Sequence, residues 1–165
     1  LGTHIFLFPR YWENLVTLPQ ASADIYRQQF QMHRYILQVV KGPVAVNDLG
    51  LVSWRNPYEV LDFWGLGNRE ARLARKEKFE TPWMQELMEH TDVDVAMVYD
   101  AWFPDIPEAW IPVGTFTQKG SIAVLGGRDV TVYALSESTA QKLKEKVRAF
   151  AEGMPEGSEF ISVTE

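Results

Sequence analysis

Apolar residues recur at helical spacing near the start of the chain. Ser22 is a suitable N-cap for a helix over residues 22–40. The apolar stripe of this helix comprises Ile25, Met32, Ile36 and Val39. Residues 1–20 are aromatic and irregular in pattern, and Pro9 and Pro19 interrupt them. We therefore expect residues 1–20 to be a lead-in from a preceding element, and residues 21–165 to be a single domain.

Short apolar runs between turn residues predict strands in the middle of the chain. They cover residues 44–46, 51–54, 59–64 and 93–99. Helices are predicted between them, one over residues 69–78 with Asn68 as its N-cap and one from Thr81-Pro82 to about His90.

The second half of the chain predicts a sheet followed by a helix. Residues 100–112 form an aromatic loop, and strands follow near residues 113–117, 121–125 and 130–134. The last two strands fit a hairpin, and Ser138 or Thr139 caps a final helix. Helices distributed around a mixed sheet predict an α/β or α+β fold, built as one sandwich-like domain.

Composition narrows the class of protein. The 165 residues suit one domain, and the net charge of −6 argues against a nucleic-acid partner. The absence of cysteine excludes disulfides, thiolate catalysis and thiolate metal sites. No apolar run approaches the roughly 20 residues that span a bilayer. The chain begins at Leu1 without features of a signal peptide, so we expect it to be a piece of a longer protein.

Polar residues at predicted strand ends are the first candidates for ligand contact. Asn47 and Asp48 follow one strand and Asp62 lies near the end of another, and ligand-binding groups of open sheets commonly project there. The structural alternative is that Asp48 closes a turn and that Asp62 pairs with a buried donor such as Arg55 or the Trp64 indole.

The aromatic loop offers a second candidate. Asp100 and Asp105 flank Trp102, and Trp110 follows. Tryptophan faces suit sugar rings, and a carboxylate pair is the requirement for glycoside hydrolysis. The alternative is that the aromatic side chains fasten the loop to the core.

A third candidate is an anion site where a strand gives way to a helix. Gly67, Asn68, Arg69 and Arg72 lie there, although Glu70 breaks the dinucleotide-binding pattern. The helix over residues 69–78 has five basic and two acidic residues, which would suit anionic lipid headgroups or a lipid-linked phosphate. A solvated charged face is the alternative.

The sequence predicts no metal site and no cofactor. Its three histidines, His4, His33 and His90, are far apart, and no metal-binding or hydrolase motif is present.

Several short motifs occur in an order that resembles a known class of membrane protein. They are residues 25–32, 44–50 (VAVNDLG), 61–67 (LDFWGLG), 98–103 (VYDAWF), 130–134 and the closing helix with Met154-Pro155. This order resembles the region after the last membrane span of bacterial polytopic proteins similar to the dolichyl-phosphate-mannose mannosyltransferases. The resemblance covers most of the chain from Ile25 onward, on short strand and turn signatures.

The resemblance implies that the parent is a membrane glycosyltransferase using a polyprenyl-phosphate sugar, with this domain on the extracytoplasmic face. It implies that the preceding transmembrane region is a partner and that the catalytic acid lies in a loop outside this chain. The shared motif residues are then mainly architectural, with some contact to substrate: Asn47, Asp48, Gly50, Asp62, Gly65 and Leu66.

Three hypotheses follow from the sequence. The first is a non-catalytic accessory domain that contacts a saccharide acceptor or a lipid-phosphate headgroup. The second is a stand-alone sugar- or phosphate-processing enzyme that uses Asp48, Asp62, Asp100 and Asp105 as acid or base. The third is an interaction module that binds a partner through an apolar patch within residues 1–12.

Overall fold

Six strands form one mixed sheet in the order β2-β1-β3-β5-β4-β6. The computed structural model describes residues 2–77 and 83–163. The strands are β1 (Val44–Val46), β2 (Val60–Asp62), β3 (Val95–Val98), β4 (Ile111–Gln118), β5 (Asp129–Ala134) and β6 (Ser158–Ser162). β1 pairs in parallel with β2 and β3, whereas β5 and β4 join the sheet antiparallel and β6 pairs antiparallel with β4.

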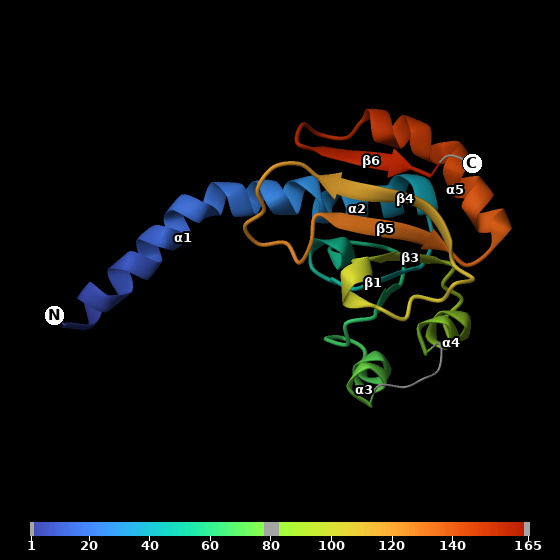
Figure 1. Ribbon diagram of the computed structural model, residues 1–165, viewed down its shortest axis with the longest axis horizontal. Helices are drawn as coiled ribbons and strands as arrows, with labels where there is room; N and C mark the ends of the chain where they lie inside the picture. The colour runs from blue at the N-terminus through green and yellow to red at the C-terminus, as the bar shows by residue number, and fades with distance from the viewer. Residues whose placement is uncertain (1, 78–82, 164–165) are drawn as a thin grey trace.

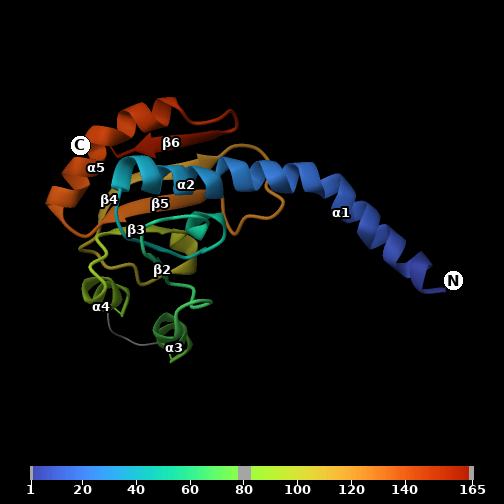
Figure 2. The same ribbon diagram turned by 180° about the vertical axis from the view of Figure 1, so that it is seen from behind.

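Helices cover both faces of this sheet (Figures 1 and 2). They are α1 (Gly2–Arg27), α2 (Gln29–Tyr35), a π-helix (Ile36–Val40), α3 (Arg69–Glu77), α4 (Trp83–His90) and α5 (Glu137–Glu152), with short 3₁₀ turns at Leu51–Ser53 and Asp100–Trp102. α2, the π-helix and α5 pack on one face, and α3 and α4 pack on the other. The predicted α/β class, a mixed sheet flanked by helices, is confirmed.

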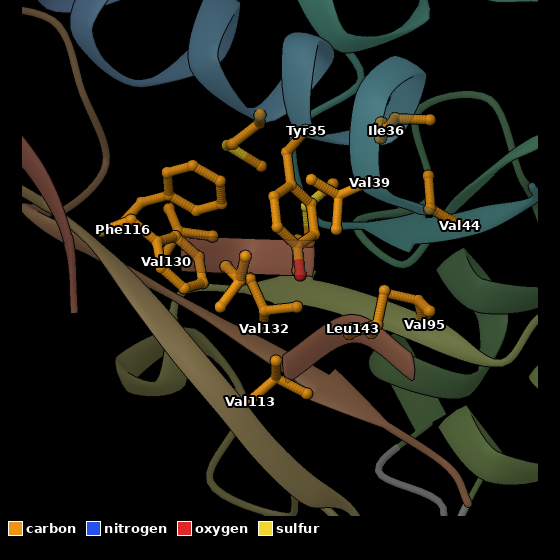
Figure 3. Packing of buried hydrophobic residues seen from close by; sticks show 14 of the residues in the cluster. Tyr35, Ile36, Val39, Val44, Val95, Val113, Phe116, Val130, Val132 and Leu143 are labelled. Carbon is orange, nitrogen blue, oxygen red and sulfur yellow. The ribbon is translucent and has the colours of Figure 1, made fainter. Parts of the chain in front are cut away.

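The larger core lies between the sheet and the layer of α2, the π-helix and α5. Tyr35 and Phe116 meet edge to face at its centre, with ring centroids 5.5 Å apart (Figure 3). Both side chains are buried. The Tyr35 hydroxyl has no hydrogen-bond partner in the described part of the chain, and burial raises its pKa.

The parallel strands bury both of their faces. In β3, Val95 and Met97 face the larger core, while Ala96 and Val98 face the smaller core under α3 and α4. Successive side chains of a strand point to opposite faces, so a strand covered on both sides reads as a continuous apolar run. This is why the run at residues 93–99 was visible in the sequence.

The N-terminal expectation is wrong at the level of secondary structure. Residues 2–27 form one continuous helix that passes through Pro9 and Pro19, and Ser22 lies inside it rather than capping it. Pro19 is exposed, so the carbonyl group that loses its helical hydrogen bond can be hydrated. The interruption falls instead at Gln28, between α1 and α2, where the backbone departs from helical geometry (φ −119°, ψ −71°).

Two predicted strands are also wrong. Residues 51–53 form a 3₁₀ turn in which the Ser53 hydroxyl donates to the Leu49 carbonyl (2.9 Å), a local bond that competes with extended structure. Residues 121–125 are a loop because the Ala123 and Val124 amides donate to the Asp24 carboxylate. β5 pairs with β4 and β3 on its two sides, so it has no free edge for a hairpin with residues 121–125.

Other boundaries shift by a few residues. α5 begins earlier than expected because Ser136 is its N-cap and accepts from the Thr139 amide (3.2 Å). Strand β6 was not anticipated. α3 and β3 lie close to their expected positions, and the predicted helix start at Thr81-Pro82 falls outside the described residues.

Candidate functional site

The carboxyl ends of the three parallel strands meet at one edge of the sheet. Asn47 and Asp48 follow β1, Asp62 is the last residue of β2, and Tyr99 and Asp100 follow β3. β1 lies between β2 and β3. The fold therefore brings four of the predicted polar candidates, Asn47, Asp48, Asp62 and Asp100, to the same edge, which we call the carboxyl edge.

Asn47 and Asp62 hold this edge together. Asn47 is 3% exposed, and its Oδ1 accepts from the Tyr99 amide (2.9 Å), so it links the ends of β1 and β3. Asp62 is also 3% exposed, and its two oxygens accept from the Trp64 amide (2.8 Å) and the Gly67 amide (2.6 Å). A buried carboxylate with both oxygens on backbone N–H groups is a structural element, since it shapes the turn after β2.

Asp48 is the more available carboxylate. It is half-buried, and Gln29 donates to its Oδ2 (2.8 Å). Burial raises the pKa of Asp48, and the charge of nearby Asp62 raises it further, whereas hydrogen bonds from the Gly50 amide and Gln29 oppose the shift. A carboxylate with a raised pKa at a strand end is suited to accepting a hydrogen bond from a ligand hydroxyl.

A row of aromatic side chains lies beside these acids. The rings of Tyr99 and Trp102 are 5.0 Å apart, and those of Trp102 and Trp64 are 4.4 Å apart. The Arg75 guanidinium lies 3.4 Å from the centre of the Trp64 ring and donates to the Trp64 carbonyl (2.6 Å). Both indoles are half-buried, so they combine structural packing with some accessible ring surface.

Gly126 is required for this arrangement. A Cβ atom at this position would lie 2.9 Å from Cη2 of Trp102 and 3.0 Å from Cε2 of Tyr99, with Cζ2 of Trp102 closer still. The loop between β4 and β5 therefore packs its backbone directly on the aromatic row.

Gln28 and Tyr99 complete the edge, and sequence reasoning missed both. The Tyr99 hydroxyl donates to Gln28 Oε1 (2.5 Å), and Gln28 Nε2 donates to the carbonyls of Gly127 (3.0 Å) and Arg128 (3.2 Å). Burial raises the pKa of Tyr99 to about 12, and the charge of Asp48 adds to this rise. Three glutamines at positions 28, 29 and 31, interrupted by Phe30, were the available signal for Gln28.

The candidates of the aromatic loop do not all join the carboxyl edge. Trp110 is 4% exposed, stacks on Phe63, and donates through Nε1 to Gln85 Oε1 (3.1 Å), so it is a core residue. Asp105 is exposed in a turn. Asp100 is exposed and accepts from the Thr131 hydroxyl (2.9 Å).

The anion-site candidates lie in the turn into α3. The Gly67 amide donates to the Asp62 carboxylate. Asn68 Oδ1 accepts from the Ala71 amide (3.0 Å), so Asn68 is the N-cap of α3. Arg69 and Arg72 are exposed. The neighbouring Gly65 has φ +84°, and a Cβ atom there would lie 2.6 Å from the Arg72 backbone, so this turn packs tightly against α3.

α1 carries a second notable feature, a set of exposed apolar side chains. Its N-terminal half projects away from the rest of the molecule (Figures 1 and 2). Between residues 11 and 18 of this helix, five large apolar side chains are between 43% and 63% exposed: Tyr11, Trp12, Leu15, Val16 and Leu18. Within the described residues, none of the helices has the length and apolarity needed to cross a membrane.

The described residues contain no group of three His, Asp or Glu side chains that could hold a metal ion. The arrangement at the carboxyl edge can supply hydrogen-bond acceptors, aromatic faces and a guanidinium. These are the groups that bind hydroxyl-rich or anionic ligands.

One comparison with known proteins gives a match. A family model described as a domain of unknown function (DUF8728) matches residues 23–133, a range that includes the carboxyl edge but ends before α5 and β6. No curated protein matches the chain, and no solved structure does.

Proposed function

The chain belongs to the DUF8728 family, a domain of unknown function, and we propose that it is a non-catalytic accessory domain of a membrane-bound glycosyltransferase. α1 connects it to the membrane-embedded part of the same protein on the extracytoplasmic face. The carboxyl edge contacts a saccharide acceptor or the phosphate headgroup of a polyprenyl-phosphate sugar. The glycosyltransferase assignment rests on the resemblance of the motif order from Ile25 onward.

The observation that carries the proposal is the exposed apolar surface of α1. Tyr11, Trp12 and Val16 are each more than half exposed on a helix that projects from the domain (Figure 1). A helix is stabilised mainly by burying its apolar side against another element. Contiguous exposed apolar residues indicate an interaction surface, and tyrosine and tryptophan are enriched at membrane–water interfaces. A membrane-embedded region of the same protein fits this surface.

The hydrogen bonds of the candidate acids support a non-catalytic role. Asp62 is saturated by backbone amides, and Asp100 accepts from Thr131 on the exposed surface. Asp48 is half-buried, and burial raises its pKa. Glycoside hydrolysis needs two carboxyl groups with separate roles. Asp62 does not suit either role, because both of its oxygens bind backbone amides.

The ligand class follows from what remains accessible at the carboxyl edge. Asp48 can accept from sugar hydroxyls, and the Trp64 and Trp102 rings offer partial aromatic faces. Arg69 and Arg72 are exposed on the adjoining helix and suit a phosphate. The carboxylate and aromatic rings suit the sugar part of a sugar phosphate, and the two arginines suit its phosphate part.

The first test is the complete reading frame with membrane fractionation. We expect several apolar segments of about 20 residues before Leu1 and a protein that sediments with membranes. A complete protein without such segments would contradict the proposal and favour a protein partner for α1.

The second test examines the carboxyl edge in the complete protein. Asp48→Asn is expected to raise KM for the acceptor while the protein remains folded, and Glu137→Gln, an exposed carboxylate at the start of α5, is the matched control. Turnover by the present chain alone would contradict the non-catalytic assignment.

A ligand-observed NMR screen with monosaccharides, short glycans and a polyprenyl-phosphate headgroup analogue identifies the ligand class.

A further inference from the structure

A pocket lies at the opposite edge of the sheet from the candidate site. It has a volume of about 210 Å³ and lies between the end of the π-helix, the start of β3 and one side of α5. Pockets for drug-sized ligands have roughly 300–1,000 Å³. This pocket is therefore matched to a smaller molecule.

The floor of the pocket is apolar. Val39, Val95 and Leu143 line it and are each at most 3% exposed. Figure 3 shows these three side chains coming from the π-helix, β3 and α5. A short apolar stem of a ligand would be desolvated on this floor.

Exposed side chains of opposite charge also line the pocket. Lys142 and Lys146 lie one turn apart on α5, and Asp92 and Asp94 precede β3. Among the described residues, no ion pair within 4.0 Å involves any of these four side chains. The two cations therefore remain available to an anionic group, and the two carboxylates remain available to a cationic one.

Local geometry also shapes the acidic side of the pocket. Asp92 has φ +52°, a left-handed backbone conformation that aspartate tolerates. The Thr139 hydroxyl contacts Asp94 Oδ2 at 3.4 Å, a long hydrogen bond that orients the carboxylate from the α5 side. The helix end beside the pocket is a π-helix, a feature that is frequent at functional sites.

We propose that this pocket binds a small zwitterion, a molecule with an ammonium group and a carboxylate or phosphate group on a short apolar stem. The acidic group contacts Lys142 and Lys146, the ammonium group contacts Asp92 and Asp94, and the stem lies on the apolar floor. This chemistry is shared by free aliphatic amino acids and by the ethanolamine phosphate headgroup of a lipid. The proposal is independent of the proposed function.

Gly42 provides a way to close the pocket without altering the fold. It lines the pocket, and a Cβ atom there would meet nothing within 4 Å. Its φ lies outside the left-handed region, so a larger side chain is compatible with the backbone. Gly42→Phe is therefore expected to fold and to fill the space.

The experiment is an amide-resolved NMR titration of the chain with L-leucine and with O-phosphoethanolamine. We expect saturable shifts at Val95 and Leu143 with at least one of them at concentrations up to about 10 mM. Stronger binding of leucine identifies a free amino acid as the source, and stronger binding of phosphoethanolamine identifies a lipid headgroup.

Variants and single-charge analogues decide the outcome. Lys146→Gln and Asp94→Asn should each weaken binding at least about tenfold, a loss of the size expected for a charge-assisted contact, and Gly42→Phe should abolish it. Lys144→Gln, the same change on α5 at a residue outside the pocket lining, should leave it unchanged. Acetate and isobutylamine should bind far more weakly than the zwitterions. Equal binding of acetate, or no saturable shift with either zwitterion, would overturn the proposal.

Discussion

Asp24 is expected to be the polar residue on which the attachment of α1 depends most. It is fully buried and accepts four hydrogen bonds. Its Oδ1 accepts from Gln118 Nε2 (2.5 Å) and Gln20 Nε2 (2.7 Å), and its Oδ2 accepts from the amides of Ala123 (2.6 Å) and Val124 (3.2 Å). It therefore ties α1 to β4 and to the loop between β4 and β5.

The magnitude follows from the number of bonds lost in Asp24→Asn. An asparagine keeps one acceptor oxygen and places its NH₂ group against two of the four donors. Gln20 Nε2 also donates to the Ser121 carbonyl (3.0 Å), whereas the other three donors bond to Asp24. Hydrogen bonds to a charged group contribute about 1.5–3 kcal/mol each, and Asp24→Asn removes at least the two bonds that reach one of its oxygens. We expect a loss of about 3–5 kcal/mol in the free energy of unfolding, a large part of the stability of a small domain.

The stability that Asp24 contributes should depend on pH in a defined direction. Burial raises the pKa of Asp24, but the hydrogen bonds from Ala123, Gln118, Gln20 and Val124 together bring it below its ordinary value of 3.8. A depressed folded-state pKa stabilises the fold above pH 3.8, and this contribution is lost as the pH falls through the lower folded value. The difference between wild type and Asp24→Asn should therefore narrow at acidic pH.

Urea unfolding followed by tryptophan fluorescence and circular dichroism measures both effects. Glu13→Gln is the matched control, because it makes the same change on an exposed part of α1. A loss of less than about 1 kcal/mol in Asp24→Asn at neutral pH, or a difference that widens on acidification, would refute the reasoning.

Three further substitutions test the packing of the sheet and its carboxyl edge. Gly114→Ala should cost at least about 1–3 kcal/mol by urea unfolding, because its Cβ atom would lie 2.6 Å from Cζ of the Phe160 ring; unchanged stability would contradict the close approach. Asp48→Asn should raise the melting temperature modestly at pH 7 and not at pH 3, because a raised folded pKa destabilises the fold as pH rises above 3.8; a lower melting temperature at pH 7 would show that the charged form is the stabilised one. Gly126→Ala should displace Trp102 and red-shift tryptophan emission; an emission spectrum identical to wild type would place the loop away from the indole.

The sequence was sufficient for the elements whose burial follows a simple period. The run at residues 93–99 predicted β3, and the apolar stripe from Met32 to Val39 predicted the helical layer that packs on the larger core. Turn residues were equally informative, since Asn68 was expected to cap α3 and does so. These features depend on local spacing and on side-chain hydrogen bonds over three or four residues.

The sequence was not sufficient where a distant partner decided the local structure. Residues 121–125 have strand-like composition, but their amides bond to a carboxylate about 100 residues away in the chain. Trp102 and Trp110 looked equivalent in the aromatic loop, yet one is half-buried at the carboxyl edge and the other is in the core.

What the sequence determined by itself is the α/β class, the approximate place of most elements and the presence of acids at strand ends. Tertiary structure alone decided that Asp48 is half-buried against Gln29 and carries a raised pKa, and that Asp62 is only 3% exposed. It also decided that Gln28 and Tyr99 join that edge and that Lys142 and Asp94 face a common pocket. The physical reason is that periodicity records which side of an element is buried, whereas hydrogen-bond partners and charges across a gap depend on how distant elements are packed together.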